Sequence, residues 1–210
     1  MTQLEISYKR DKRGGKRKGA GRPPRGERAG VAHAARPRFD RRLPIHVTLR
    51  MDPRVWNLRS RRSLGVLNRA LFAAADRFGV RIVQFSILGN HLHLLVEANN
   101  TAALVRGMRG LSIRIAKGMN RLMSEKGRVI GDRYHTRVLK TPTEVRHAIH
   151  YIRHNHRKHM AEIGEHLPAT WVDPYSSDSP AIGIILPPPR TWLVQRSRPP
   201  TRHVTTPPIP

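Results

Sequence analysis

Two apolar segments separated by a short turn constrain the fold of this chain more than any other feature. Residues 80–88 are rich in β-branched and aromatic side chains, and residues 91–98 form a second apolar segment with two polar positions near its start. Gly89-Asn90 between them is a two-residue hairpin signal. The sequence therefore predicts an antiparallel β-hairpin, against which the other elements must pack.

The elements around this hairpin complete an α+β domain. Their order along the chain is β-α-β-β-α-β-α, which favours a ferredoxin-like antiparallel sheet with packed helices. Residue 143, a threonine, is the expected N-cap of the last helix. Besides the hairpin, the predicted elements are strands at 45–49 and 134–139 and helices at 60–78, 101–125 and 144–159.

The charge of the chain indicates a polyanionic partner. It has 40 Lys and Arg against 14 Asp and Glu, a formal net charge of +26 in 210 residues. Because the charge is spread over the whole chain, nucleic acid fits better than a membrane surface.

No apolar run approaches the ~18–20 residues that cross a bilayer. The absence of cysteine excludes a disulfide framework, a thiolate metal site and a Cys nucleophile. We expect a cytoplasmic, nucleoid-associated protein without a membrane partner.

Both ends of the chain differ in composition from the middle, so we divide it into 1–42, 43–165 and 166–210. Residues 1–42 hold 14 basic and 4 acidic residues with many Gly and Pro, which predicts a disordered basic arm. Within this arm, Arg17 and Arg22 lie in an AT-hook-like element, and a non-specific phosphate-binding tail is the alternative. Residues 166–210 are rich in proline and are predicted to be a mostly irregular tail.

His91 and His93 are the candidate metal ligands. Side chains alternate along a strand, so both imidazoles point to one face and can bind a single divalent ion. The pattern alone is weak, because twelve histidines produce about one His-x-His pair by chance. The second such pair, His154 and His156, lies in a predicted helix, where residues two apart diverge.

Tyr151 and Asn155 lie four residues apart and therefore on one face of the last helix. A tyrosine at the edge of an apolar stripe is usually a packing residue. The functional alternative makes Tyr151 a nucleophile and Asn155 a third, oxygen-donating ligand. Two imidazoles and a carboxamide suit Mg²⁺ or Mn²⁺.

Taken together, these motifs resemble a known family. Residues 89–96 (GNHLHLLV) are similar to the His-hydrophobic-His strand of the single-tyrosine HUH transposases. Residues 131–135 (GDRYH) and 151–155 (YIRHN) resemble later motifs of the bacterial REP-associated tyrosine transposases, within the insertion-sequence-200-like superfamily. The resemblance covers about residues 43–160. One departure is His156, where the family often has a proline after the asparagine.

The resemblance implies an HUH-nuclease fold and a metal-dependent enzyme that cuts and rejoins single-stranded DNA near hairpins. It assigns His91, His93 and Asn155 to the metal and Tyr151 to a 5′-phosphotyrosine intermediate. A non-catalytic relative that binds hairpin DNA or acts as a regulator is the alternative. A basic RNA-binding protein explains the charge but not the paired motifs. Monomer and homodimer both stay open, and with them whether the tyrosine acts within its own chain or across a dimer.

Several other residues are candidates for the site or for DNA contacts. His46 and Glu97 could approach the metal, although a hydrogen-bonded sheet residue and a solvated strand end are the favoured interpretations. Tyr134 is a competing nucleophile. Basic residues of the second long helix and of the segment after it are expected to contact phosphates and to make binding salt-dependent. The DNA-binding candidates are Arg17, Arg22, Arg106, Arg109, Arg114, Lys117, Arg121, Arg133 and Arg137.

Overall fold

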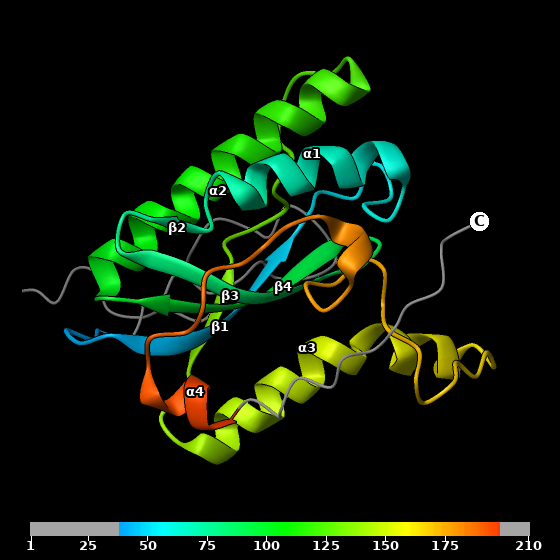
Figure 1. Ribbon diagram of the computed structural model, residues 1–210. Coiled ribbons are helices and arrows are strands. Elements are labelled where there is room, and N and C mark those ends of the chain that lie inside the picture. The colour runs from blue at the N-terminus through cyan, green and yellow to red at the C-terminus, as the bar shows by residue number, and fades with distance from the viewer. Residues whose placement is uncertain (1–37, 198–210) are drawn as a thin grey trace, which may run out of the picture. The chain divides into compact units, whose positions relative to one another are not determined.

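A computed structural model describes residues 38–197 of the chain (Figure 1). The predicted arm up to residue 37, with Arg17 and Arg22, and the last thirteen residues of the predicted tail lie outside the described residues. The elements are β1 Leu43–Arg50, α1 Arg61–Phe72, β2 Asp76–Arg77, β3 Val80–Ile87, β4 His91–Ala98, α2 Thr101–Met123, β5 His135–Val138, α3 Pro142–Glu162, the 3₁₀ helix η1 Pro180–Ile182, and α4 Trp192–Ser197.

The predicted hairpin is confirmed. Strands β3 and β4 pair antiparallel, and Leu88 N–H donates to the His91 carbonyl at 2.9 Å across Gly89-Asn90. The five strands follow the order β2-β3-β4-β1-β5, and every pair is antiparallel. Apart from the short β2, this is the strand order of a ferredoxin-like sheet, so the predicted α+β class is also confirmed.

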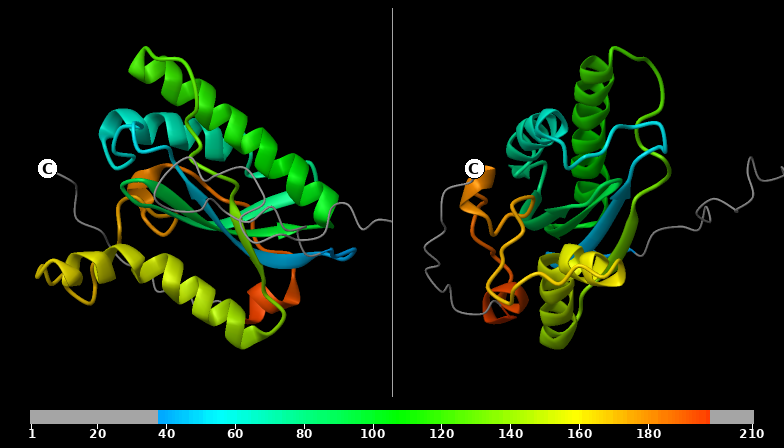
Figure 2. Two further views of the ribbon diagram at one scale, coloured as in Figure 1. Left: turned by 180° about the vertical axis from the view of Figure 1, so that it is seen from behind. Right: turned by 90° about the vertical axis from the view of Figure 1, so that its right-hand side faces the viewer.

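Helices cover both faces of the sheet, which separates two apolar cores. Helices α1 and α2 lie on one face and α3 and α4 on the other (Figures 1 and 2). The alternating side chains of β4 divide accordingly: Leu92 and Leu94 join the core under α1 and α2, whereas Leu95 joins the core under α3. Strand β4 lies between β1 and β3, so its polar positions on the α3 face are enclosed as well.

Helices α1 and α2 pack closely because glycine stands at their contact. A Cβ at Gly118 would lie 2.4 Å from Cγ1 of Val66 on α1. On the same helix α2, a Cβ at Gly107 would lie 2.6 Å from Cγ2 of Val80, which belongs to β3. Either substitution would force the helix away from its partner, since interiors are packed at crystal-like density. Gly118 therefore allows the close approach of α2 to α1, and Gly107 that of α2 to the sheet.

Two sequence predictions about helix ends are wrong. The predicted helix 60–78 ends at Phe72, because the chain then turns into β2 and adopts left-handed backbone at Phe78 (φ 57°) and Gly79 (φ 76°). The N-cap of α3 is Thr141 instead of Thr143. Thr141 and Glu144 form a capping box, and proline occupies the first turn between them.

The segment after α3 lacks long elements but packs against the sheet. Glu97 is buried, and its carboxylate accepts hydrogen bonds from the backbone N–H groups of Arg190 (2.8 Å) and Thr191 (2.7 Å). Asp173 is also buried and pairs with Arg59 at 2.8 Å. The packed body of the protein therefore extends beyond residue 165. Within the described residues, no helix is long and apolar enough to cross a membrane.

Candidate active site and nucleic-acid interface

The imidazoles of His91 and His93 converge on the α3 face of the sheet. Their Nε2 atoms lie 3.1 Å apart, and the two rings are nearly perpendicular at 89°. The Nδ1 atoms point the other way: that of His91 lies 2.7 Å from Oδ1 of Asn90, and that of His93 lies 3.1 Å from Oγ1 of Thr48. The spacing of the Nε2 atoms suits two neighbouring ligand positions of one ion.

His46 of β1 belongs to the same cluster. Its Nε2 lies 3.2 Å from Nδ1 of His93. The favoured interpretation of a hydrogen-bonded sheet histidine therefore holds, but its partner is a candidate metal ligand. Thr48, two residues further along β1, lies directly opposite His93 in the β1–β4 register.

Burial keeps these three imidazoles neutral at pH 7. It is the largest cause that lowers the pKa of His46 and of His91 from 6.5 to about 4 and that of His93 to about 3. Positive charge adds to the effect: Arg137 acts on His46, and Arg50 acts on His91. Neutral imidazole is the form that binds a cation.

Helix α3 places Tyr151 over the histidine cluster. Its neighbour Ile152 is buried in the core under α3, which fixes the rotation of the helix about its axis. The Tyr151 ring lies 5.0 Å from that of His93 and 5.7 Å from that of His46, centroid to centroid, with edge-on geometry in both cases. The side chain is 42% exposed, so a large substrate could reach it.

Asn155 lies between two residues of α3 that border the cluster. Tyr151 precedes it by one turn, and His159, one turn later, is close enough for its charge to lower the pKa of both His91 and His93. Residues at this spacing share one helix face. Asn155 is 3% exposed, and its Nδ2 has no hydrogen-bond partner among the described residues.

The remaining candidates lie away from this cluster. Tyr134 packs against the core under α1 and α2, on the other side of the sheet from Tyr151. Glu97 binds the backbone of residues 190 and 191 instead of lying solvated at a strand end. The rings of His154 and His156 face different neighbours, His150 and Trp171, so they diverge as predicted.

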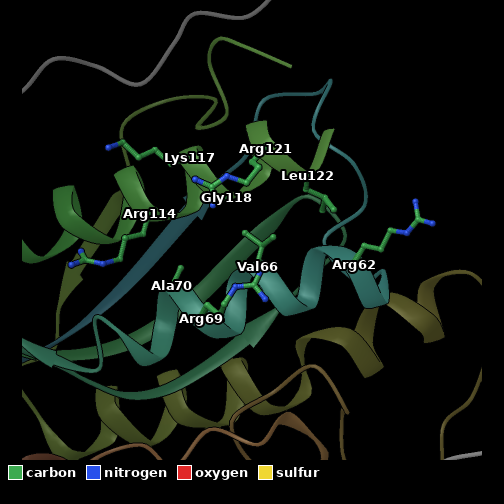
Figure 3. A pocket seen from close by; sticks show the side chains of 9 residues that line it. All are labelled: Arg62, Val66, Arg69, Ala70, Arg114, Lys117, Gly118, Arg121 and Leu122. Carbon is green, nitrogen blue, oxygen red and sulfur yellow. The ribbon is translucent and has the colours of Figure 1, made fainter. Parts of the chain in front are cut away.

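A basic groove lies on the opposite face, between α1 and α2 (Figure 3). It has a volume of about 490 Å³, and no acidic side chain lines it. Gly118 and Val66, which meet at the close helix contact, form part of its lining. Its cationic residues are Arg62 and Arg69 from α1 and Arg114, Lys117 and Arg121 from α2.

The structure thus brings together three of the predicted DNA-binding residues and separates the others. Arg106 and Arg109 are exposed on α2 but do not line the groove. Arg137 lies on β5 opposite His46 and pairs with Glu144 at 3.2 Å, on the side of the histidine cluster. Arg133 precedes β5 and is half-buried.

Three residues of these two sites were not predicted from the sequence. Thr48 lies two residues after His46 in β1, so both side chains point to the same face of the sheet. This alternation could have predicted that Thr48 lies near the histidine cluster. Arg62 and Arg69 lie seven residues apart and therefore on one stripe of α1, a spacing that could have indicated a second basic helix face.

Comparisons with known proteins bear on the fold. The structure of a REP-associated tyrosine transposase bound to a REP hairpin is similar to this chain, with a TM-score of 0.52 and 17% identity over 70% of this chain and 82% of that one. The chain has the fold of that transposase. A putative transposase from Deinococcus radiodurans R1 matches with a TM-score of 0.41 and 15% identity, over 61% and 95% of the two chains. No protein-family profile and no curated protein matches the sequence.

The depressed pKa values predict an acid-sensitive fold. In the unfolded chain these imidazoles titrate near 6.5, so between about pH 6.5 and pH 4 the unfolded state binds more protons than the folded state. The free energy of unfolding should therefore fall as the pH is lowered through this window. Urea denaturation of metal-free protein measures it.

The matched variants are His93→Gln and His147→Gln. The first replaces a buried imidazole by a side chain that does not titrate and should flatten the pH dependence. The second alters an exposed residue of α3 and should leave the dependence as it is. Equal pH slopes for wild type and His93→Gln would contradict the prediction.

Proposed function

We propose that the protein is a transposase-like nuclease and strand transferase that acts on single-stranded DNA beside hairpins. The observation that carries this proposal is the meeting of two convergent imidazoles and a tyrosine on one face of the sheet. The shared fold with a REP-associated tyrosine transposase supports it, and so does the net charge of +26.

The residues present fit a divalent ion, Mg²⁺ or Mn²⁺. His91 and His93 would hold it through Nε2, and Asn155 would supply the amide oxygen. The unpartnered buried Nδ2 of Asn155 is consistent with this role, because the oxygen and nitrogen of an amide can exchange places by a flip. No three His, Cys, Asp or Glu side chains in residues 38–197 form a metal cluster, so the amide is the third ligand of the proposal. A bound ion supplies Lewis-acid polarisation of the scissile phosphate.

The protein's own residues supply the nucleophile and its position. The Tyr151 hydroxyl oxygen attacks the phosphorus and loses its proton, and the bond from phosphorus to the 3′ oxygen breaks. The products are a 5′-phosphotyrosine and a 3′ oxygen that takes up a proton. A second 3′-OH reverses the step, releases the tyrosine and rejoins the strand, because the covalent bond conserves the energy of the phosphodiester.

The basic groove between α1 and α2 would bind the phosphates of the DNA outside the reacting nucleotides. Five cations without an acidic neighbour give strong, sequence-independent attraction to a phosphate backbone. The groove and the histidine cluster lie on opposite faces of the sheet, so binding and cleavage are separable by mutation.

Cleavage is tested by incubating the full chain with a labelled single-stranded oligonucleotide that carries a hairpin, in Mn²⁺ or Mg²⁺. We expect a covalent protein–DNA adduct that survives denaturing electrophoresis. Tyr151→Phe should abolish it, because the nucleophilic oxygen is removed, while DNA binding stays within about twofold. Tyr134→Phe should leave adduct formation unchanged.

Two outcomes would contradict the proposal. An adduct that forms equally well with Tyr151→Phe would show that another group is the nucleophile. Binding of the hairpin by the wild type without any adduct, in either metal and across varied hairpins, would favour a non-catalytic hairpin-binding protein.

The groove is tested through the salt dependence of hairpin binding. Removing two phosphate contacts with Lys117→Ala and Arg121→Ala should weaken binding and reduce the slope of log K against log salt by about 2. Arg77→Ala, an exposed arginine of β2 outside the groove, is the control. Equal slopes for the double variant and the control would exclude the groove as the phosphate site.

A further inference from the structure

We propose that Asn90, His46 and Thr48 are positioning residues that hold the protons of both candidate ligands on Nδ1. Each imidazole then presents the lone pair of its Nε2 to the common point between the rings. This inference rests on the proposed function, because a proton on Nδ1 leaves the Nε2 lone pair of each histidine free to bind the proposed metal ion. Its test, however, also has a readout that needs no metal and no DNA.

The first half of the arrangement concerns His91. Its Nδ1 lies 2.7 Å from Oδ1 of Asn90, a distance typical of a strong hydrogen bond. With the oxygen of the Asn90 amide facing the ring, the proton of neutral His91 lies on Nδ1, because a carboxamide oxygen only accepts. Asn90 belongs to the turn between β3 and β4 and immediately precedes the ligand, so the turn itself fixes the orientation of the ring.

The second half concerns His93, which has two polar side-chain atoms near Nδ1. Oγ1 of Thr48 lies at 3.1 Å and Nε2 of His46 at 3.2 Å. The antiparallel register places Thr48 directly across from His93, so the contact follows from strand pairing. A hydroxyl can accept or donate, and a neutral His46 protonated on Nδ1 accepts through Nε2. Acting as acceptors, both atoms stabilise the same proton position on His93.

As a consequence, the Nε2 lone pairs of His91 and His93 repel each other. With both protons on Nδ1, the two Nε2 atoms face each other 3.1 Å apart without a hydrogen between them. A cation at that point removes the repulsion. In the other tautomer of either ring, an Nε2–H would donate to the opposite Nε2 and would block the site. Outer hydrogen bonds of this kind set the tautomer of metal-binding histidines in general.

The first measurement is the tautomer of each ring at pH 7, read from the side-chain ¹⁵N shifts of metal-free, full-length protein labelled at histidine. We expect His91 and His93 both to carry their proton on Nδ1. Asn90→Ala should move the proton of His91 to Nε2, and the double variant Thr48→Val with His46→Phe should do so for His93. Asn90→Asp and Thr48→Ser keep the acceptor and should behave as wild type.

The second measurement is Mn²⁺ affinity, from the EPR signal of free Mn²⁺ during titration. Asn90→Ala and the double variant should each weaken binding by about 10–100-fold, and the two conservative variants should restore it. Thermal unfolding of each variant shows that the loss does not come from a failure to fold.

The outcomes separate the two proposals. Nε2–H tautomers at His91 or His93 in the wild type, or full Mn²⁺ affinity without the acceptors, would overturn the positioning role. If the wild type shows the expected tautomers but binds no Mn²⁺, the positioning of the protons stands and the metal centre of the proposed function fails.

Discussion

Strand β4 pairs with both β1 and β3, and these two pairings determine how the core and the candidate site are arranged. They set which side chains of β4 face which helix layer, and a shift by one residue would exchange the two faces completely. In the observed register, Leu92 and Leu94 lie under α1 and α2, whereas His91 and His93 face α3. The same pairing brings Thr48 opposite His93. The register of the strands therefore determines both the composition of the core and the positions of the candidate site residues.

Helix α3 covers the histidines of the sheet and so determines their protonation state. Imidazoles on an open sheet would titrate near their ordinary value, but burial under α3 holds them neutral well below pH 7. The helix also carries Tyr151 over them, and the segment after it fixes its far end: Arg153 pairs with Asp178 at 2.6 Å, and Arg157 donates to the carbonyl of Pro168 at 2.8 Å. Pro168 and Asp178 thus support the helix that carries the site.

Much of this arrangement could be predicted from local sequence. The hairpin, the order of the elements and the shared face of His91 and His93 follow from patterns within one or two elements. Helix ends were less predictable: the stripe of apolar residues that continues to Phe78 hid the left-handed backbone there, and Thr143 competed with the better-placed Thr141.

Relations between distant segments could not be predicted in the same way. The burial of Glu97 depends on residues some ninety positions later, and the groove depends on the crossing of α1 with α2 at Gly118. The run of basic residues in α2 predicted one wall of that groove from the sequence. The other wall, on α1, becomes apparent only once the packing of α1 against α2 is known. The tyrosine and the histidines were matched by motif, and the ring contacts in the structure place them together.

We propose that the fold holds a preformed divalent-ion site between His91 and His93, beneath Tyr151. Crystals of the full chain soaked in Mn²⁺, with anomalous diffraction recorded at the manganese edge, test it most directly. We expect one strong anomalous peak between the two Nε2 atoms, at about 2–2.3 Å from each. A peak elsewhere, or rings that point apart with no peak between them, would contradict it.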